Sequence, residues 1–256
     1  MAKISLIIPT HNEENYLPKL LDSVEEARER FSSDPSSVEV IVVDNQSTDN
    51  SAAIAKQRGC LVVEEKKRII AAVRNAGARA ARGEIITFTD ADNVLHPDTF
   101  RAIEKALSLP KVVGGATGVR LDRMSPGIAV AYAIIVPMVW ATRMDTGVVF
   151  CKRKDFESIG GYNESLKFAE DVEFLWRLTK LGRERGQRLT RLRKCKALNS
   201  TRKFDQFGDW HYVALLGKFF WSLLFPGYSI DKFAHKYWYS DAGSPMEKPT
   251  WEKSET

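Results

Sequence analysis

The fold is decided by an apolar run that ends in two carboxylates, Glu84-Ile85-Ile86-Thr87-Phe88-Thr89-Asp90-Ala91-Asp92. Three other short apolar runs precede it, at residues 4–9, 38–43 and 60–63. The segments between these runs have helical spacing, with apolar stripes at Leu17, Leu20, Leu21 and Val24, around Ile54, and over residues 69–81. Apolar strands that alternate with helices are typical of a parallel sheet covered on both faces. We therefore predict an α/β fold with a mostly parallel, Rossmann-like central sheet.

Polar residues follow three of the four predicted strands. They are Thr10-His11-Asn12-Glu13 after the first strand, Asp44-Asn45-Gln46-Ser47 after the second, and Asp90-Ala91-Asp92-Asn93 after the fourth. In open parallel sheets, ligands bind in the crevice beyond the carboxyl ends of the strands. We therefore expect the three clusters to lie on one edge of the sheet and to form the functional site.

Asp90 and Asp92 predict a metal site. Two carboxylates at a spacing of two on extended backbone point to the same side, and they repel each other unless a cation lies between them. Hard oxygen ligands favour Mg²⁺ or Mn²⁺, which can absorb the negative charge of a leaving nucleoside diphosphate. The alternative is a solvated acidic turn, because Asp and Asn are common after strands.

Asp44 and Arg74 each allow two interpretations. Asp44 can accept a hydrogen bond from a nucleobase or a ribose hydroxyl, or it can form an Asx turn that caps the next helix. Arg74 lies on the third predicted helix. It can bring a cation toward a diphosphate, or it can be an exposed helical arginine.

The second half of the chain has less regular patterns. They predict a helix after Pro97, strands at residues 112–119 and 147–151, a turn at Gly160-Gly161 and a helix over residues 170–181. Neither an internal repeat nor a flexible linker separates the halves. We predict one domain over residues 1–240, with a first lobe (1–120), a less regular second lobe (121–240) and a polar tail (241–256).

Composition and charge narrow the function classes. The 256 residues are 44% hydrophobic and 28% charged, which excludes a wholly disordered chain. The three cysteines are widely separated and form no zinc or disulfide pattern, so we expect a reducing cytoplasm. The net charge is +5, and basic residues concentrate at 177–203. That segment suits phosphate groups or an anionic membrane, or it is a solvated face. Positive charge is the sole feature that suggests nucleic-acid binding, and the sequence contains no recognised nucleic-acid-binding module. We therefore expect no nucleic-acid partner.

Two stretches, residues 127–142 and 212–228, are unusually apolar. Both are shorter than the roughly 20 residues that a spanning helix needs. They predict either buried helices or helices that lie in a membrane interface. Peripheral contact with the inner face of the membrane is therefore one of the two expectations.

Four motifs, taken in order, resemble the inverting glycosyltransferases of family 2, which have the GT-A fold. They are Pro9-Thr10-His11-Asn12-Glu13-Glu14; Asp44-Asn45-Gln46-Ser47-Thr48-Asp49; Arg74-Asn75-Ala76-Gly77 with Asp90-Ala91-Asp92; and Gly160-Gly161-Tyr162-Asn163-Glu164 followed by Glu170-Asp171-Val172-Glu173. Ordered motifs are more specific than any single one. The resemblance implies a metal-dependent enzyme that moves a sugar from a nucleoside diphosphate sugar, UDP before GDP, to an acceptor hydroxyl on a lipid or glycan.

The resemblance also implies a role for each matching residue. Pro9, Thr10 and Glu13 would line the nucleoside pocket, Asp44 would contact the base, and Arg74 the base or phosphates. Asp90 would lie near the ribose and the metal, and Asp92 would ligate the metal, with His211 as a candidate third ligand or else a packed residue. In the catalytic pair Glu170-Asp171, Asp171 would be the base, kept ionised by the helix dipole until it takes a proton. Arg202 lies in a segment that resembles a loop closing over the donor, where it or Lys203 would stabilise the diphosphate.

The chain departs from the family in one place. Residues 65–70 carry Glu-Lys-Lys-Arg-Ile-Ile where the family has a small, glycine-rich stretch. Two alternatives to an enzyme of this family remain. A nucleotide-sugar-binding protein without turnover is opposed by the presence of Asp90, Asp92 and Asp171. A Rossmann oxidoreductase is opposed by a first turn that lacks Gly-x-Gly-x-x-Gly.

Overall fold

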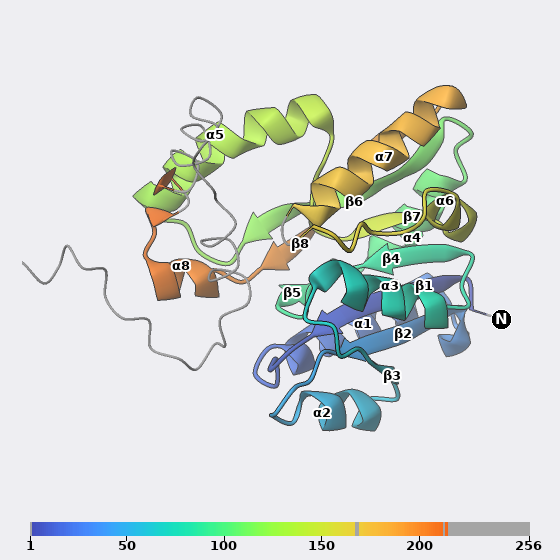
Figure 1. The fold of residues 1–256 in the computed structure, drawn as a ribbon, viewed down its shortest axis with the longest axis horizontal. Coiled ribbons are helices and arrows are strands. Elements are labelled where there is room, and N and C mark those ends of the chain that lie inside the picture. Colours follow the sequence, from blue (N-terminus) through green and yellow to red (C-terminus); the bar gives the residue numbers. More distant parts are fainter. Residues whose placement is uncertain (1, 167–168, 212, 215–256) are drawn as a thin grey trace, which may run out of the picture.

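A single sheet of eight strands organises the protein in the computed structural model, which describes residues 2–166, 169–211 and 213–214 (Figure 1). The strand order is β3-β2-β1-β4-β7-β6-β8-β5. The strands are β1 (Ile4–Thr10), β2 (Val38–Asp44), β3 (Leu61–Glu64), β4 (Ile85–Phe88), β5 (Asn93–Val94), β6 (Val112–Leu121), β7 (Val149–Lys152) and β8 (Arg188–Asn199). The helices are α1 (Leu17–Phe31), α2 (Ser51–Gln57), α3 (Ile70–Ala80), α4 (Thr99–Leu107), α5 (Pro126–Thr142), α6 (Arg153–Ser158), α7 (Glu170–Glu184) and α8 (Arg202–Phe207), and a 3₁₀ turn η1 spans Pro35–Ser37.

The predicted fold class is confirmed. Strands β1 to β4 are parallel neighbours, as the apolar runs indicated. The second half of the sheet is mixed, because β7 is antiparallel to both β4 and β6 while β8 is parallel to β6. The predicted lobe boundary at residue 120 falls inside β6, so the two lobes share one sheet. The predicted polar tail, and all of the second apolar stretch except residues 213–214, lie outside the described residues.

Helices cover both faces of the sheet. Alternate residues of β1 enter different cores: Leu6 and Ile8 pack with α1 and α4, whereas Ile7 packs with α3, α6 and α7. This alternation follows from the two-residue period of a strand. The buried strands are therefore largely apolar on both sides, with a few buried polar residues such as Ser5 and Thr87 among them.

Helix α3 lies close against the sheet because Gly77 has no side chain. A Cβ atom at this position would collide with the side chain of Ile7 on β1 and would lie 2.8 Å from Cγ2 of Val43 on β2. A helix packed against strands this tightly has no room for a methyl group. Gly77 thus fixes how closely the motif on α3 approaches the strand ends.

The basic segment 177–203 is not one solvated face. Most of it forms the end of α7 and strand β8, which the sequence patterns did not predict because lysine and arginine are uncommon in strands. Arg177 pairs with Glu173 at 2.5 Å, and Arg191 pairs with the buried Asp145 at 2.5 Å. Part of this positive charge is therefore neutralised inside the fold.

Helix α5 corresponds to the first apolar stretch, but it is not a buried helix. Of its described side-chain positions, only Gly127, Ile128 and Ala131 are buried. The others are half-buried or exposed. No helix in the described part of the chain is long and apolar enough to cross a membrane.

Candidate active site

The three polar clusters lie on one edge of the sheet, as predicted. Thr10, the last residue of β1, is paired in register with Asp44, the last residue of β2. Asp44 is in turn paired with Glu64 at the end of β3. On the other side of β1, the backbone N–H of Thr89 donates to the carbonyl of Ile7, which brings the residues after β4 to the same edge.

Asp44 forms a local turn, as one of its two interpretations had it, but it does not cap the next helix, which begins at Ser51 after the N-cap residue Asn50. Oδ1 of Asp44 accepts a hydrogen bond from the backbone N–H of Ser47 at 3.3 Å. This bond uses one of several acceptor positions on the carboxylate. A contact between Asp44 and a nucleobase, and a nucleoside pocket beside Pro9 and Thr10, stay predictions.

Arg74 is buried and is surrounded by three carboxylates. Its Nη1 lies 2.7 Å from Oε1 of Glu170 and 2.6 Å from Oδ1 of Asp171, and its Nη2 lies 3.0 Å from Oδ1 of Asp90. The side chain is 5% exposed, so the interpretation as an exposed helical arginine is wrong. Arg74 instead joins the end of β4 to the first turn of α7. Its predicted contact with the nucleotide stays a prediction.

Asp171 lies in the first turn of α7, where the sequence placed it. Its Oδ1 accepts hydrogen bonds from Arg74 and from the hydroxyl of Tyr162, the latter at 3.1 Å. Burial raises the pKa of Asp171 to about 7 against the opposing effect of Arg74, and the nearby charges of Glu170 and Asp90 raise it further. Burial therefore opposes the ionised form of Asp171 that the helix dipole was expected to favour.

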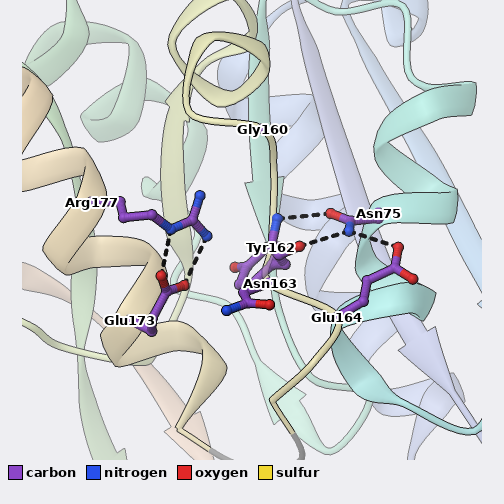
Figure 2. A pocket seen from close by; sticks show the side chains of 7 residues that line it. All are labelled: Asn75, Gly160, Tyr162, Asn163, Glu164, Glu173 and Arg177. Carbon is purple, nitrogen blue, oxygen red and sulfur yellow. Dashed lines mark hydrogen bonds and ion pairs between the residues drawn. The ribbon is translucent and has the colours of Figure 1, made fainter.

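Tyr162 and Asn75 position this carboxylate, and the sequence analysis assigned neither of them a role. Figure 2 shows Asn75 on α3 bound to the chain at Tyr162: its Oδ1 accepts from the Tyr162 N–H, and its Nδ2 donates to the Tyr162 carbonyl, both at 2.9 Å. Burial raises the pKa of Tyr162, so the phenol stays a hydrogen-bond donor. Both residues belong to motifs that carry the family resemblance, and this membership was the one signal in the sequence that could have identified them.

A cavity of about 500 Å³ opens on the outer side of this junction (Figure 2). Its side chains are paired with one another: Glu173 with Arg177, and Asn75 with Glu164 at 3.0 Å. Arg177 also donates to the carbonyls of Ile159 and Gly161. The groups around the cavity therefore hold the turn at Gly160-Gly161 against α7, which supports the position of Tyr162.

A second arginine neutralises the other carboxylates of the site. Arg202 forms a bidentate pair with Glu13, with both N–O distances at 2.6 Å, and its Nε lies 3.0 Å from Oδ2 of Asp92. The guanidinium also lies over the ring of Tyr16 at 4.7 Å, a contact that the sequence analysis missed. Arg202 begins the short helix α8, so the expectation of a loop at this position is wrong.

The pKa of Glu13 shows the balance of forces around Arg202. Burial raises this pKa, and the hydrogen bond and charge of Arg202 lower it without cancelling the effect of burial. The charges of Asp92 and Asp90 raise it further. Three carboxylates therefore share this corner of the site, and their mutual repulsion makes it attractive to a cation.

The donor set suits a divalent cation with few protein ligands. Asp92 and Asp90 supply hard oxygen atoms, and Mg²⁺ or Mn²⁺ can bind through one or two carboxylates together with phosphate oxygens and water. In the structure each aspartate is balanced by a different arginine, not by one cation between them. Within the described part of the chain no three acidic, histidine or cysteine side chains form a metal cluster. The Nδ1 of His211 lies 2.6 Å from the Gly208 carbonyl, and its role as third ligand stays a prediction.

Comparisons with known proteins agree with this arrangement. Residues 5–126 match the family model described as glycosyl transferase family 2. Among curated proteins, the chain is 32% identical to glycosyltransferase GlyA of Streptococcus pneumoniae over 110 residues, which are 41% of this chain and 15% of that protein. It is 32% identical to human dolichyl-phosphate beta-glucosyltransferase over 116 residues, which are 41% of this chain and 36% of that protein. The chain therefore spans only a minor part of the length of these relatives.

Solved structures share the fold. A mannosyltransferase from Pyrobaculum calidifontis, in complex with GDP-Man and Mn²⁺, superposes with a TM-score of 0.61 at 24% identity, covering 77% of this chain and 56% of that one. Glucosyl-3-phosphoglycerate synthase from Mycobacterium tuberculosis, in complex with Mn²⁺, UDP and phosphoglyceric acid, has a TM-score of 0.59 at 18% identity, covering 84% and 77%. Staphylococcus aureus TarS with UDP-GlcNAc has a TM-score of 0.59 at 20% identity, covering 78% and 59%.

Proposed function

We propose that the chain transfers a sugar from a nucleoside diphosphate sugar to an acceptor hydroxyl, because residues 5–126 match the family model of glycosyl transferase family 2. One observation carries the proposal. Arg74 joins Asp90, at the donor edge of the sheet, to Asp171 at the start of α7. A candidate base is thereby held beside the strand ends at which a nucleotide binds in sheets of this kind.

Asp171 acts as the general base of an inverting reaction. It removes the proton of the acceptor hydroxyl while that oxygen attacks the anomeric carbon from the side opposite the diphosphate. A pKa near 7 suits this task, because a base is most effective when its pKa lies close to the working pH. Glu170 pairs with Arg74 and positions this guanidinium beside Asp171. Tyr162 fixes the orientation of the carboxylate.

The donor site combines the strand ends with the corner around Arg202. Pro9, Thr10 and Asp44 line the pocket for the nucleoside. We expect the donor to be a UDP sugar rather than a GDP sugar. Asp92 and Asp90 would hold Mn²⁺ or Mg²⁺, which as a Lewis acid would stabilise the negative charge of the leaving diphosphate. Two of the structural neighbours carry Mn²⁺ and a nucleotide or nucleotide sugar, which supports this assignment.

Calorimetric titration of UDP and of GDP tests the donor site. Each nucleotide is added to the full chain with Mn²⁺ and with chelator, for the wild type and for Asp92→Ala. Asp98→Ala is the matched control. Asp98 is also an aspartate, only six residues further along the chain, but its side chain is 45% exposed and lies outside the site. We expect one nucleotide to bind with metal, to lose binding in Asp92→Ala and to keep it in Asp98→Ala. Absence of binding by both nucleotides would reject the donor site.

Turnover separates an enzyme from a binding protein. We expect the wild type to release nucleoside diphosphate from a sugar nucleotide in the presence of acceptor, or slowly with water as acceptor. Asp171→Asn should bind the nucleotide as the wild type does and release product far more slowly. Binding without product release by the wild type, across the common UDP and GDP sugars, would favour the nucleotide-sugar-binding protein.

A further inference from the structure

Helix α5 is apolar on all sides, although most of it faces solvent. Its seventeen residues, Pro126–Thr142, contain no charged side chain. None of the described helices and strands packs extensively along it. Figure 1 shows α5 running apart from the helices that cover the sheet. A surface helix of a globular protein normally carries a polar face toward water, and α5 has none.

The exposed residues of α5 form one stripe, apart from Thr142 at its end. They are Pro126, Ala129, Val130, Ala133, Ile134, Pro137, Trp140 and Ala141, which a period of three to four residues places on the same side of the helix. Val130 is 40% exposed, Ile134 44% and Trp140 58%. Contiguous exposed apolar side chains of this size mark an interaction surface. An interaction surface would account for an apolar helix that does not belong to the core.

Basic side chains from β8 adjoin the C-terminal end of this stripe. The guanidinium groups of Arg191 and Arg193 lie 5.7 Å and 5.3 Å from the ring centroid of Trp140. Lys196 lies close to Arg191, beside Gly118. Arg191 is neutralised by Asp145, but no carboxylate in the described ranges forms an ion pair with Arg193 or Lys196. The free positive charge therefore lies where the exposed tryptophan ends the apolar stripe.

We propose that α5 and the neighbouring basic residues of β8 dock the protein on an anionic lipid bilayer. The apolar stripe would enter the boundary between headgroups and acyl chains, with the helix lying in the plane of the membrane. Trp140 has the amphipathic ring that is enriched at this depth. Arg193 and Lys196 would contact anionic headgroups, since cytoplasmic leaflets attract basic residues. The seventeen residues of α5 are fewer than the roughly 20 that a spanning helix needs.

The docking surface is connected to the candidate active site through α8. Arg123, just before α5, pairs with Asp205 at 2.5 Å and with Asp209 at 2.7 Å, and Asp205 lies on α8. Arg202, which holds Glu13 and Asp92, is the first residue of the same helix. A bilayer against α5 would therefore lie next to the element that carries Arg202. Docking itself does not depend on the proposed transferase activity.

Flotation of the full chain with lipid vesicles tests this surface without any nucleotide. The vesicles are phosphatidylcholine alone and phosphatidylcholine mixed with phosphatidylglycerol. We expect the wild type to float with the mixed vesicles and to be released by salt. Trp140→Ser should weaken the binding by about ten-fold, since a buried aromatic side chain contributes at least that much. The double variant Arg193→Gln with Lys196→Gln should weaken it by about thirty-fold, since each basic residue near an anionic surface contributes about 1 kcal/mol.

Matched variants keep the test specific. Trp176→Ser removes a tryptophan that is 59% exposed on α7, and Arg101→Gln with Lys105→Gln removes two exposed charges on α4. Both controls should float as the wild type does. Thermal unfolding of every variant confirms that it is folded. The proposal is overturned if the wild type does not bind mixed vesicles, or if Trp140→Ser binds as well as Trp176→Ser. It is also overturned if the wild type is a dimer that Trp140→Ser dissociates while vesicle binding is absent, because the occupant is then a second copy.

Discussion

Nη1 of Arg74 lies 2.6 Å from Oδ1 of Asp171, although the two residues are 97 positions apart in the chain. Arg74 belongs to the part of the chain that matches the family model, and Asp171 lies beyond it. The contact thus places the candidate base of the second lobe beside the strand ends of the first. Because Arg74 is buried, its charge and those of its carboxylate partners depend on one another, and several predictions derive from this dependence.

Replacing Arg74 should destabilise the fold. Arg74→Ala leaves Glu170 and Asp171 without their buried counter-ion, which we expect to lower the free energy of unfolding by about 3–5 kcal/mol. The loss should be largest at high pH. Without Arg74 the pKa of Asp171 rises further, so protonation of the folded state at lower pH relieves part of the penalty. Urea unfolding of the wild type and of Arg74→Ala, at pH 8 and at pH 5, measures both the loss of stability and its dependence on pH.

Arg79→Ala is the matched control for that comparison. Arg79 lies on the same helix, and its side chain is 64% exposed. Its removal should change the free energy of unfolding by about 0.5 kcal/mol or less. If Arg74→Ala is no less stable than Arg79→Ala, the carboxylate cluster does not depend on its arginine.

The transfer rate should follow the titration of Asp171. Burial raises the pKa of this carboxyl to about 7, and a general base works only in its deprotonated form. We therefore expect kcat/KM to rise tenfold per pH unit below about pH 7 and to level off above it. Asp171→Asn should lower kcat by about 10²- to 10⁴-fold and remove this limb of the profile. A wild-type rate that is constant between pH 5 and pH 8 would exclude Asp171 as the base.

Arg202 should compete with a divalent cation for the same carboxylates. In Arg202→Ala, Glu13 and Asp92 lose their guanidinium partner, so Mn²⁺ should bind more tightly than to the wild type in the absence of nucleotide. Tighter binding to the folded state raises the melting temperature. We expect MnCl₂ to increase Tm more in Arg202→Ala than in the wild type. Adding Asp92→Asn to this variant should abolish the extra increase.

Arg58→Ala is the control for the Mn²⁺ experiment. Arg58 pairs with Asp22 at 2.6 Å on the surface, so its removal also frees a carboxylate, but away from the site. The response of this variant to MnCl₂ should equal that of the wild type. Equal responses of Arg58→Ala and Arg202→Ala would show that Asp92 and Glu13 do not form a cation site.

A methyl group at Gly77 should destabilise the protein. Alanine is the better helix former by about 1 kcal/mol, so Gly77→Ala on an open helix face would be stabilising. Here the added Cβ would collide with Ile7 and lie 2.8 Å from Cγ2 of Val43. We expect overpacking to win and to lower the free energy of unfolding by about 1–3 kcal/mol in a urea titration. An increase in stability would show that α3 can move away from β1 without loss.

Local patterns in the sequence were sufficient for the first half of the fold. The apolar runs became β1 to β4, and their parallel order brought Thr10, Asp44 and the Asp90-Ala91-Asp92 cluster to one edge. The start of α7 at Glu170 was also predictable, because acidic residues favour the first turn of a helix. These features depend on periodicity over a few residues and on a general rule for parallel sheets. Neither requires knowledge of distant contacts.

Only the tertiary structure decided how the charges are paired and which apolar residues are buried. Nothing local in the chain shows that Arg74 meets Asp171, that Arg202 meets Glu13, or that Tyr162 donates to the candidate base. The direction of the Asp171 pKa shift also depends on burial, which the position of the residue in the chain does not reveal. Strand β8 was not predicted, because its basic residues are untypical of a strand although it pairs with β6. The sequence of helix α5 is apolar and does not show whether the helix is buried. Its exposure depends on which elements pack against it, and these contacts exist only in the folded protein.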